Sequence, residues 1–385
     1  MLMSLMGSNL LSWKIPLFKI YWDESDVENI SNCIKSGMYW AEGPVIQEFE
    51  ALIADYIGTK HCVTFNSGTS AQHAALLAYG IKEGDEVIVP SFTFISTANS
   101  ALFVGTKPVF ADIEEETFGL DPDSVLENIS SKTRAIMPVH YGGCPCKIQE
   151  LREVADDYGL ILIEDAAEAF GAEINGKKIG SFGEASMLSF CQNKVITTGE
   201  GGALVTNSEE IYQKLKLLRS HGRADNTQYF SSTQTSDYIA LGYNFRMSSL
   251  TAALGISQIQ KTAEIIKLRR ERASYFISRL KKEVENNVHF SEIPKSYFNV
   301  YQLFTILADK RDELKDYLAG RGIMTKIYFS PVHLTYFYKN ILGYECKLPV
   351  TENLARSALT LPMHPCLTFD EIDYISNEIK NFYGD

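Results

Sequence analysis

Long apolar runs are missing from this sequence, and their absence excludes one broad class of protein. No stretch approaches the ~20 consecutive apolar residues that a membrane-spanning helix requires. The N-terminal stretch MLMSLMGSNLLSWK is apolar, but it has no basic start and no small-residue cleavage site, so we expect no export signal. Internal repeats and low-complexity segments are missing as well. The sequence therefore predicts a globular protein that does not associate with a membrane.

Net positive charge is also missing. Over 385 residues the chain carries a formal charge of −12, with a pI near 5.2. Such a surface repels nucleic acids and anionic membranes over most of its area, so we exclude both kinds of partner. A local basic pocket for a phosphate group is still compatible with this charge.

The seven cysteines lack the regular spacing of a disulfide framework, and their number is odd. We therefore expect reduced thiols and a cytoplasmic location. The one close pair, Cys144 and Cys146, is separated by a single proline, which is not the spacing of a redox or zinc pair. No further His or Cys completes a ligand set, so a plain loop is favoured and no metal is expected.

Strand and helix patterns alternate through the first half of the chain. Strands are predicted at 61–65, 86–90, 108–112, 135–139 and 160–164, and helices at 69–79, 95–103 and 151–158. This alternation predicts right-handed crossovers and a mostly parallel sheet that is covered on both faces. Farther along, Asn175-Gly176 predicts the turn of a hairpin over 173–179.

The length of the chain favours two or three domains, at about 150 residues each. Two helices, at 23–35 and 45–56, precede the alternation and are expected to pack over the large domain. A helical stripe over 248–284 leads into a smaller C-terminal α/β domain, in which strands are predicted at 300–307 and 324–328 and two short helices follow. We place the large domain at 1–255 and the small domain at 256–385.

Lys194 lies between a predicted core strand and a glycine-rich turn, in the stretch SFCQNKVITTGEGG. An amine in partly apolar surroundings loses the solvation of its charged form, which favours the neutral amine that attacks an aldehyde. This is the chemistry of a Schiff base. Because most lysines are solvated, an ordinary loop lysine is the alternative, and only partners elsewhere in the chain decide between the two.

Three further motifs supply such partners. The stretch NSGTS, residues 66–70, begins a helix, where free N–H groups suit a phosphate, although a simple helix cap is the commoner use. Asp165 ends an apolar strand and either holds a protonated pyridine nitrogen or caps the next segment. The stretch Ser91-Phe92-Thr93-Phe94 follows another strand, and an aromatic there either stacks on a flat heterocycle or packs in the core. Together these are the parts of a site for pyridoxal phosphate.

Several segments carry a resemblance to a known family: NSGTSAQHAAL, GDEVIVPSFTFISTANS, EDAAEAFGA, SFCQNKVITTGEGGALVTN, GYNFRMSSLTAALGISQI and, more loosely, YFSPVHL. From about residue 15 to its C-terminus the sequence resembles the sugar aminotransferases of the DegT/DnrJ/EryC1/StrS family. The resemblance implies the aspartate aminotransferase (type I) fold and the cofactor pyridoxal 5′-phosphate, with pyridoxamine phosphate as its intermediate form. It also implies a homodimer with shared active sites.

The resemblance also implies roles for residues around the cofactor ring. Lys194 is the catalytic lysine that forms the Schiff base, and Asp165 pairs with the pyridine nitrogen. Phe94 stacks on the ring. Glu168 belongs to the cofactor-binding set and stands where glutamine is more usual in the family.

A second group of residues is assigned to the phosphate and the substrate. By the resemblance, Gly68, Thr69 and Ser189 hold the phosphate, and Asn244 reaches the phosphate of the neighbouring subunit's cofactor. His333, in YFSPVHL, faces the substrate, and a packed loop histidine is an equally good interpretation.

The function implied is transfer of an amino group from L-glutamate to the C4 ketone of a nucleotide-linked 4-keto-6-deoxy sugar. Glu168 together with NKVITTGEGG most resembles the GDP-perosamine synthases, which implies GDP-4-keto-6-deoxy-mannose as substrate and a place in O-antigen polysaccharide biosynthesis. A UDP-linked 4-keto amino sugar is an alternative substrate.

Two different functions are weighed against this one. A 3-dehydratase on the same fold carries histidine at the lysine position, so the presence of Lys194 speaks against it. A non-catalytic regulatory module is expected to lose the lysine or the aspartate, and this chain keeps both Lys194 and Asp165. The aminotransferase is therefore favoured.

Overall fold

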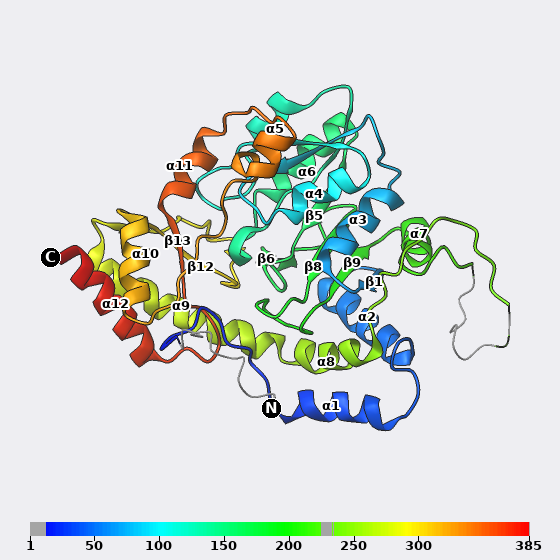
Figure 1. The fold of residues 1–385 in the computed structure, drawn as a ribbon, viewed down its shortest axis with the longest axis horizontal. Coiled ribbons are helices and arrows are strands. Elements are labelled where there is room, and N and C mark those ends of the chain that lie inside the picture. The colour runs from blue at the N-terminus through cyan, green and yellow to red at the C-terminus, as the bar shows by residue number, and fades with distance from the viewer. Residues whose placement is uncertain (1–12, 225–232, 234, 385) are drawn as a thin grey trace, which may run out of the picture.

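A seven-stranded sheet forms the centre of the molecule (Figure 1). The structure is a computed structural model that describes residues 13–224, 233 and 235–384. The first twelve residues lie outside the described ranges, so the expectation that the N-terminal stretch is not an export signal stays a prediction. The strands are β1 (His61–Phe65), β2 (Glu86–Pro90), β3 (Lys107–Ala111), β4 (Thr133–Ile136), β5 (Ile161–Asp165), β8 (Ala185–Ser189) and β9 (Gly202–Thr206).

Their order in the sheet is β1-β9-β8-β5-β4-β2-β3. Every pairing from β8 to β3 is parallel, and only β9 runs antiparallel, between β1 and β8. The prediction of a mostly parallel sheet is therefore confirmed. Since parallel strands end at the same edge, the carboxyl ends of β2, β5 and β8 lie along one edge, which is where open α/β sheets bind ligands.

Both faces of the sheet are covered, because successive strand residues point to opposite sides. Along β1, for example, Cys62 belongs to one core and Val63 to the other. The first core is covered by α2 (Pro44–Ile57), α5 (Pro122–Asn128), α6 (Ile148–Tyr158) and α8 (Ser249–Gln260). The second core is covered by α3 (Gly68–Ala78), α4 (Ser96–Phe103) and α7 (Glu209–Arg219). The result is a three-layer α/β/α arrangement.

A smaller α/β unit, built largely from the C-terminal part of the chain, has its own core. Its antiparallel sheet has the order β10 (Val288–His289), β12 (Phe304–Ala308) and β13 (Ala358–Leu361). The helices around it are α9 (Thr262–Val284), α10 (Arg311–Gly320), α11 (Pro349–Ser357) and α12 (Phe369–Gly384). Figure 1 shows α10 and α12 side by side at the C-terminal end of the molecule, with α9 running from α8 into this unit. The exact boundary at residue 255 stays a prediction.

Short elements complete the description. The predicted hairpin is confirmed as β6 (Glu173–Ile174) and β7 (Lys177–Lys178), and β11 (Tyr297–Phe298) pairs with β6. The remaining helical turns are η1 (Tyr141–Gly143), η2 (Val332–Leu334) and η3 (Phe337–Ile341). No helix in the described ranges is long and apolar enough to cross a membrane.

Three predicted elements of the C-terminal part of the chain differ in the structure. The helical stripe over 248–284 is divided at Lys261, where α8 ends and α9 begins. The strand predicted at 324–328 is wrong, because only a single bridge, from Lys326 to Thr360, forms there. The backbone of this stretch pairs instead with the N-terminal segment: Met324 N donates to Ile15 O at 2.9 Å. The strand predicted at 300–307 is β12, which starts four residues later, at Phe304.

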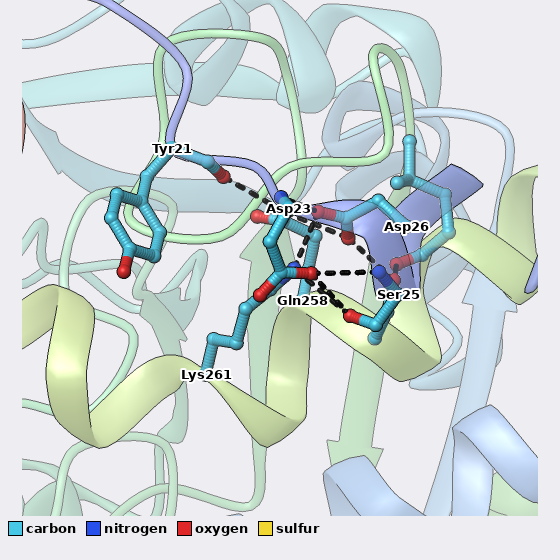
Figure 2. A network of polar contacts seen from close by, with 8 residues as sticks. Tyr21, Asp23, Ser25, Asp26, Gln258 and Lys261 are labelled. Atoms are coloured by element: carbon cyan, nitrogen blue, oxygen red, sulfur yellow. Dashed lines mark hydrogen bonds and ion pairs between the residues drawn. The ribbon is translucent and has the colours of Figure 1, made fainter. Parts of the chain in front are cut away.

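A polar network fixes helix α1 (Glu24–Lys35) against α8 (Figure 2). The side chain of Asp26 is buried and accepts hydrogen bonds from Ser257 Oγ at 2.5 Å, from Gln258 Nε2 at 3.1 Å and from Lys261 Nζ. Gln258 Nε2 also donates to Tyr21 O at 3.0 Å, which fixes the segment that precedes α1.

The charge of Asp26 is stabilised by this network. Burial favours the neutral acid, but the hydrogen bonds from Lys261 and Ser257 outweigh burial, so the pKa of Asp26 lies below its ordinary value. A carboxyl group whose pKa is lowered by folding contributes stability above its unfolded-state pKa of about 3.9, and this contribution is lost as the pH falls through the folded-state pKa.

We predict that Asp26→Asn lowers the free energy of unfolding by about 2 kcal/mol at neutral pH, because the ammonium of Lys261 loses its buried anion. Urea unfolding from pH 7 to pH 3 measures this, and the difference from the unsubstituted protein should shrink below about pH 4. Glu28→Gln, on the exposed face of the same helix, is the control and should change stability by no more than about 0.5 kcal/mol. Equal effects of the two substitutions would contradict the prediction.

Candidate active site

Asp165, the last residue of β5, is a buried acid at the carboxyl edge of the sheet. Its side chain is 4% exposed, and Oδ2 accepts hydrogen bonds from Gln72 Nε2 at 2.6 Å and from Thr97 Oγ1 at 2.7 Å. Oδ1 accepts from Ala167 N at 3.2 Å. Burial raises the pKa of Asp165, and the hydrogen bonds from Thr97 and Ala167 and the charge of Lys194 act against this increase.

No ion pair involves Asp165 in the part of the chain that the structure describes; its contacts there are neutral donors. A buried carboxylate without a cation partner is costly, so such groups pair with a cation or become protonated. Asp165 is therefore a buried anion that would be stabilised by a cation, and the described chain places no cationic side chain in contact with it.

The neighbouring acid, Glu164, has a different role. Its side chain points to the other side of β5 and is fully buried, and it accepts backbone N–H groups from Gly180, Phe182 and Gly183 at 2.8 Å. His140 Nε2 lies 3.1 Å from Glu164 Oε2. Burial opposes the charge of Glu164, but these donors lower its pKa below the ordinary value. Glu164 thus stabilises the loops behind the strand and leaves Asp165 as the acid of the site.

Lys194 follows β8 in a tight loop, and its side chain is 13% exposed. Its Nζ lies 3.4 Å from Oε1 of Glu168, whose other oxygen accepts from Gly142 N at 2.8 Å. Lys194 and Glu168 are both close enough to Asp165 for their charges to act on it. The structure therefore brings together Lys194, Glu168 and Asp165, three of the residues that the sequence assigned to the site.

The Lys194 loop is held by contacts on both sides. At its base, Phe190 N donates to Gly201 O and Thr198 N donates to Phe190 O, each at 2.9 Å. From the C-terminal unit, Gln302 Nε2 donates to the backbone oxygen of Asn193. These contacts fix the backbone on either side of the lysine, so the point from which its side chain extends is set by the fold.

The N-terminal segment forms a wall beside the lysine. A small cavity is lined by residues 18–21 of this segment, by residues 192–195 of the Lys194 loop and by Gln258 of α8. Gln258 holds the segment through Tyr21 O, as Figure 2 shows. No sequence motif indicated this wall, because residues 18–21 touch the site through tertiary packing alone.

The start of α3 lies against the end of β8 and the start of β9. Ser67 caps the helix by accepting a hydrogen bond from Ser70 N at 3.1 Å. The N–H groups of Gly68 and Thr69 have no helical acceptor, because they lie in the first turn. A Cβ atom on Gly68 would lie 3.3 Å from Ser189 Cβ. Gly68, Thr69 and Ser189 are therefore neighbours, and the close fit at Gly68 explains why a glycine stands there.

Two predicted residues lie at the surface of the single chain. Phe94, just after β2, is 58% exposed, and its ring centroid is 6.2 Å from that of Phe329. Asn244 is exposed too; its backbone oxygen accepts from Asn66 Nδ2 at 3.4 Å, next to the start of α3. Both side chains are thus accessible to a ligand or to a second subunit, and their roles stay predictions.

His333 occupies a different environment. It is 2% exposed, its Nδ1 lies 2.6 Å from Ser91 Oγ, and its Nε2 lies 3.5 Å from Glu352 Oε1. Burial lowers the pKa of His333, although Glu352 acts in the opposite direction. These contacts describe the packed loop histidine that the sequence left open, so the structure gives no support to its substrate-facing role.

The cysteine pair is a loop, as the sequence favoured. Cys144 and Cys146 are both buried free thiols just after η1. The described residues contain no group of three or more His, Cys, Asp or Glu side chains that could hold a metal ion.

Comparisons with known proteins agree with this geometry. The family described as the DegT/DnrJ/EryC1/StrS aminotransferase family matches residues 21–380. The GDP-perosamine synthase of Escherichia coli O157:H7 is 36% identical over 374 residues, which cover 96% of this chain and 99% of that protein. The UDP-4-amino-4,6-dideoxy-N-acetyl-beta-L-altrosamine transaminase of Campylobacter jejuni is 35% identical over 367 residues, 93% of this chain and 94% of that protein.

A solved structure gives the same result for the fold. The PLP-form of Spr1654 from Streptococcus pneumoniae has a TM-score of 0.88 at 25% identity, and the match covers 96% of this chain and 97% of that one. The predicted fold class, an α/β protein with the fold of pyridoxal phosphate-dependent aminotransferases, is confirmed.

We predict that Gly202→Ala displaces the start of α3, because the added Cβ atom would lie 2.5 Å from the backbone nitrogen of Gly68. Overpacking of this kind costs about 1–3 kcal/mol, and urea unfolding measures it. Gly320→Ala, at the end of α10, is the control, since nothing lies within 4 Å of its added Cβ atom. Unchanged stability in Gly202→Ala would show that the start of α3 does not depend on this close approach.

Proposed function

The chain belongs to the DegT/DnrJ/EryC1/StrS aminotransferase family, and we propose that it transfers an amino group from L-glutamate to the C4 ketone of a nucleotide-linked 4-keto-6-deoxy sugar. The observation that carries the proposal is the buried carboxylate of Asp165, which has no cation partner in the described chain and lies within electrostatic range of the enclosed amine of Lys194. An enclosed anion and a nearby amine are the two groups that a protonated pyridine aldehyde requires.

The residues present fit pyridoxal phosphate. Asp165 supplies the anion for its protonated ring nitrogen, and Lys194 supplies the amine for its aldehyde. The N–H groups at the start of α3, together with Ser189, suit its phosphate, since a helix N-terminus favours an anion. Phe94 has an exposed aromatic face that suits its ring.

When bound, this cofactor supplies an electron sink and carries the amino group between the two substrates. In its ionised form, Asp165 would make a positive charge on the ring favourable. Nζ of Lys194 would remove the proton from Cα of glutamate and return it on the cofactor side; one water then releases 2-oxoglutarate, and the amino group stays with the cofactor. In the second half, the amine would replace the C4 oxygen of the sugar, which leaves as water, and Nζ would donate a proton to C4. Glu168, with Oε1 3.4 Å from this nitrogen, would orient it.

We further propose that the active unit is a homodimer. The side chain of Asn244 is exposed beside the start of α3, and we assign it to the phosphate of the neighbouring subunit's cofactor. On this assignment each active site is complete only when two chains associate.

The nucleotide that we assign to the substrate is GDP. The similarity to a GDP-perosamine synthase over 99% of its length supports this choice. The product would then be GDP-perosamine, an amino sugar for a polysaccharide such as O-antigen. The similarity to a UDP-sugar transaminase is nearly as high, so a UDP-linked 4-keto amino sugar is the second candidate.

We predict that Lys194→Ala abolishes transamination, with a loss of at least about 10³-fold, because the variant lacks both the amine that attacks the aldehyde and the group that moves the proton. Formation of 2-oxoglutarate measures activity, and circular dichroism checks the fold. Lys178→Ala is the control: its ion pair with Glu173 lies on the β6–β7 hairpin, and activity should be retained. Appreciable turnover by Lys194→Ala refutes the proposal.

The choice of nucleotide is tested by offering the purified protein GDP-4-keto-6-deoxy-mannose and a UDP-linked 4-keto amino sugar, each with glutamate. We expect amination of the GDP sugar at C4 with a kcat/KM at least about tenfold higher. This ratio corresponds to about 1.4 kcal/mol of discrimination in the transition state. The reverse order would assign the chain to the second candidate.

A further inference from the structure

Two side chains that no sequence motif singled out donate to the same oxygen of Asp165. Gln72 lies one turn into α3, and Thr97 lies in the first turn of α4. Gln72 Nε2 is 2.6 Å and Thr97 Oγ1 is 2.7 Å from Asp165 Oδ2, and both side chains are fully buried. Two helices and a strand thus converge on one carboxylate oxygen.

The amide of Gln72 has no other hydrogen-bond partner in the described chain. Its Oε1 atom is buried and unpaired, although an unpaired buried polar atom costs free energy. Six of the eleven residues of α3 are apolar, and a leucine at position 72 would avoid this cost. Among the residues that the structure describes, the contact with Asp165 is therefore the one polar contact that accounts for a glutamine at this buried position.

The hydroxyl of Thr97 is polarised by a second threonine. Thr93 Oγ1 lies 2.8 Å from Thr97 Oγ1, and Thr93 is buried as well. A hydroxyl has one proton to donate, so a Thr97 that donates to Asp165 accepts from Thr93. This chain of hydroxyls points its hydrogen atoms toward the carboxylate and strengthens the bond to a negative charge.

We propose that Gln72 and Thr97 are positioning residues that fix the orientation of the Asp165 carboxylate and keep it ionised for the cofactor's ring nitrogen. The proposal rests on the proposed function. Neither residue is assigned a contact with the cofactor or the substrate. Because both donors bind Oδ2, the rotation of the carboxylate is fixed and Oδ1 keeps only one backbone donor, Ala167 N at 3.2 Å.

The charges around Asp165 show why such donors are needed. Burial raises the pKa of Asp165 and favours the neutral acid, which cannot balance a ring cation. The positive charge of Lys194 opposes this effect, and the negative charge of Glu168 adds to it. Donors on Oδ2 favour the ionised form without bringing a net charge into the site.

The test uses four variants of the full-length protein, loaded with pyridoxal phosphate. Thr97→Val and Gln72→Leu each remove one donor with little change in volume. Thr97→Ser keeps the hydroxyl and should restore the properties of the unsubstituted protein. Ser100→Ala is the control, since the Ser100 hydroxyl is equally buried on α4 but donates to Thr97 O, not to Asp165.

Two readouts on the bound cofactor separate positioning from general destabilisation. Equilibrium dialysis gives the dissociation constant of pyridoxal phosphate, which we expect to rise about tenfold or more in Thr97→Val and Gln72→Leu. The pH midpoint of the near-visible absorbance should rise in the same two variants, because the ring carries less positive charge. Neither readout should move in Thr97→Ser or Ser100→Ala.

A third readout does not use the cofactor. A raised carboxyl pKa lowers stability as the pH rises from about 4, the unfolded-state pKa, to the folded-state pKa. The urea midpoint of the cofactor-free protein should therefore fall further over this range in Thr97→Val than in the unsubstituted protein. A purely structural loss would lower the midpoint equally at every pH, which would count against the inference.

The outcomes distinguish the inference from the proposed function. Unsubstituted protein that binds no pyridoxal phosphate overturns the proposed function. If the unsubstituted protein binds pyridoxal phosphate, and Thr97→Val and Gln72→Leu bind it equally well with the same pH midpoint, the inference is overturned. The proposed function is then left intact. Weaker binding with a shifted midpoint in these two variants, and in them alone, supports the inference.

Discussion

The site depends on one buried negative charge. Asp165 is 4% exposed at the end of β5, has neutral donors as its contacts and forms no ion pair within the described chain. This constraint explains the arrangement of the elements around the site. The cost of burying a carboxylate is offset only if hydrogen-bond donors and a cation lie next to it. The parallel sheet brings the acid to an edge where the starts of α3 and α4 supply donors. The loop after β8 brings Lys194 to the same place.

Much of this arrangement could be predicted from the sequence, because it depends on local patterns. The strands at 61–65 and 86–90 have the predicted bounds, since a short apolar run between turn residues has few other solutions. Parallel strands end at one edge, so Lys194 and Asp165, each after an apolar strand, were expected to be neighbours. The glycine of NSGTS was expected at a helix start, and it begins α3.

Other features could not be predicted, because tertiary contacts decide them. The apolar stripe of 248–284 continues across Lys261, so the division of the helix is not visible in the pattern. The stretch 324–328 has the composition of a strand, but its neighbour Gly322 bonds to Ile15, some 300 residues earlier in the chain. Gln72 and Thr97 resemble ordinary helix residues. For Gln72 the available signal was a polar side chain in a helix whose other buried residues are glycine, alanine and leucine.

The most direct test of the central claim is the protonation state of the ring nitrogen over Asp165. Pyridoxal phosphate labelled with ¹⁵N in the ring can be bound to the purified protein, and its ¹⁵N chemical shift measured by NMR between pH 6 and pH 9. The account predicts the shift of a protonated pyridine throughout this range in the unsubstituted protein, and that of a neutral pyridine in Asp165→Asn. A neutral pyridine in the unsubstituted protein would contradict the account.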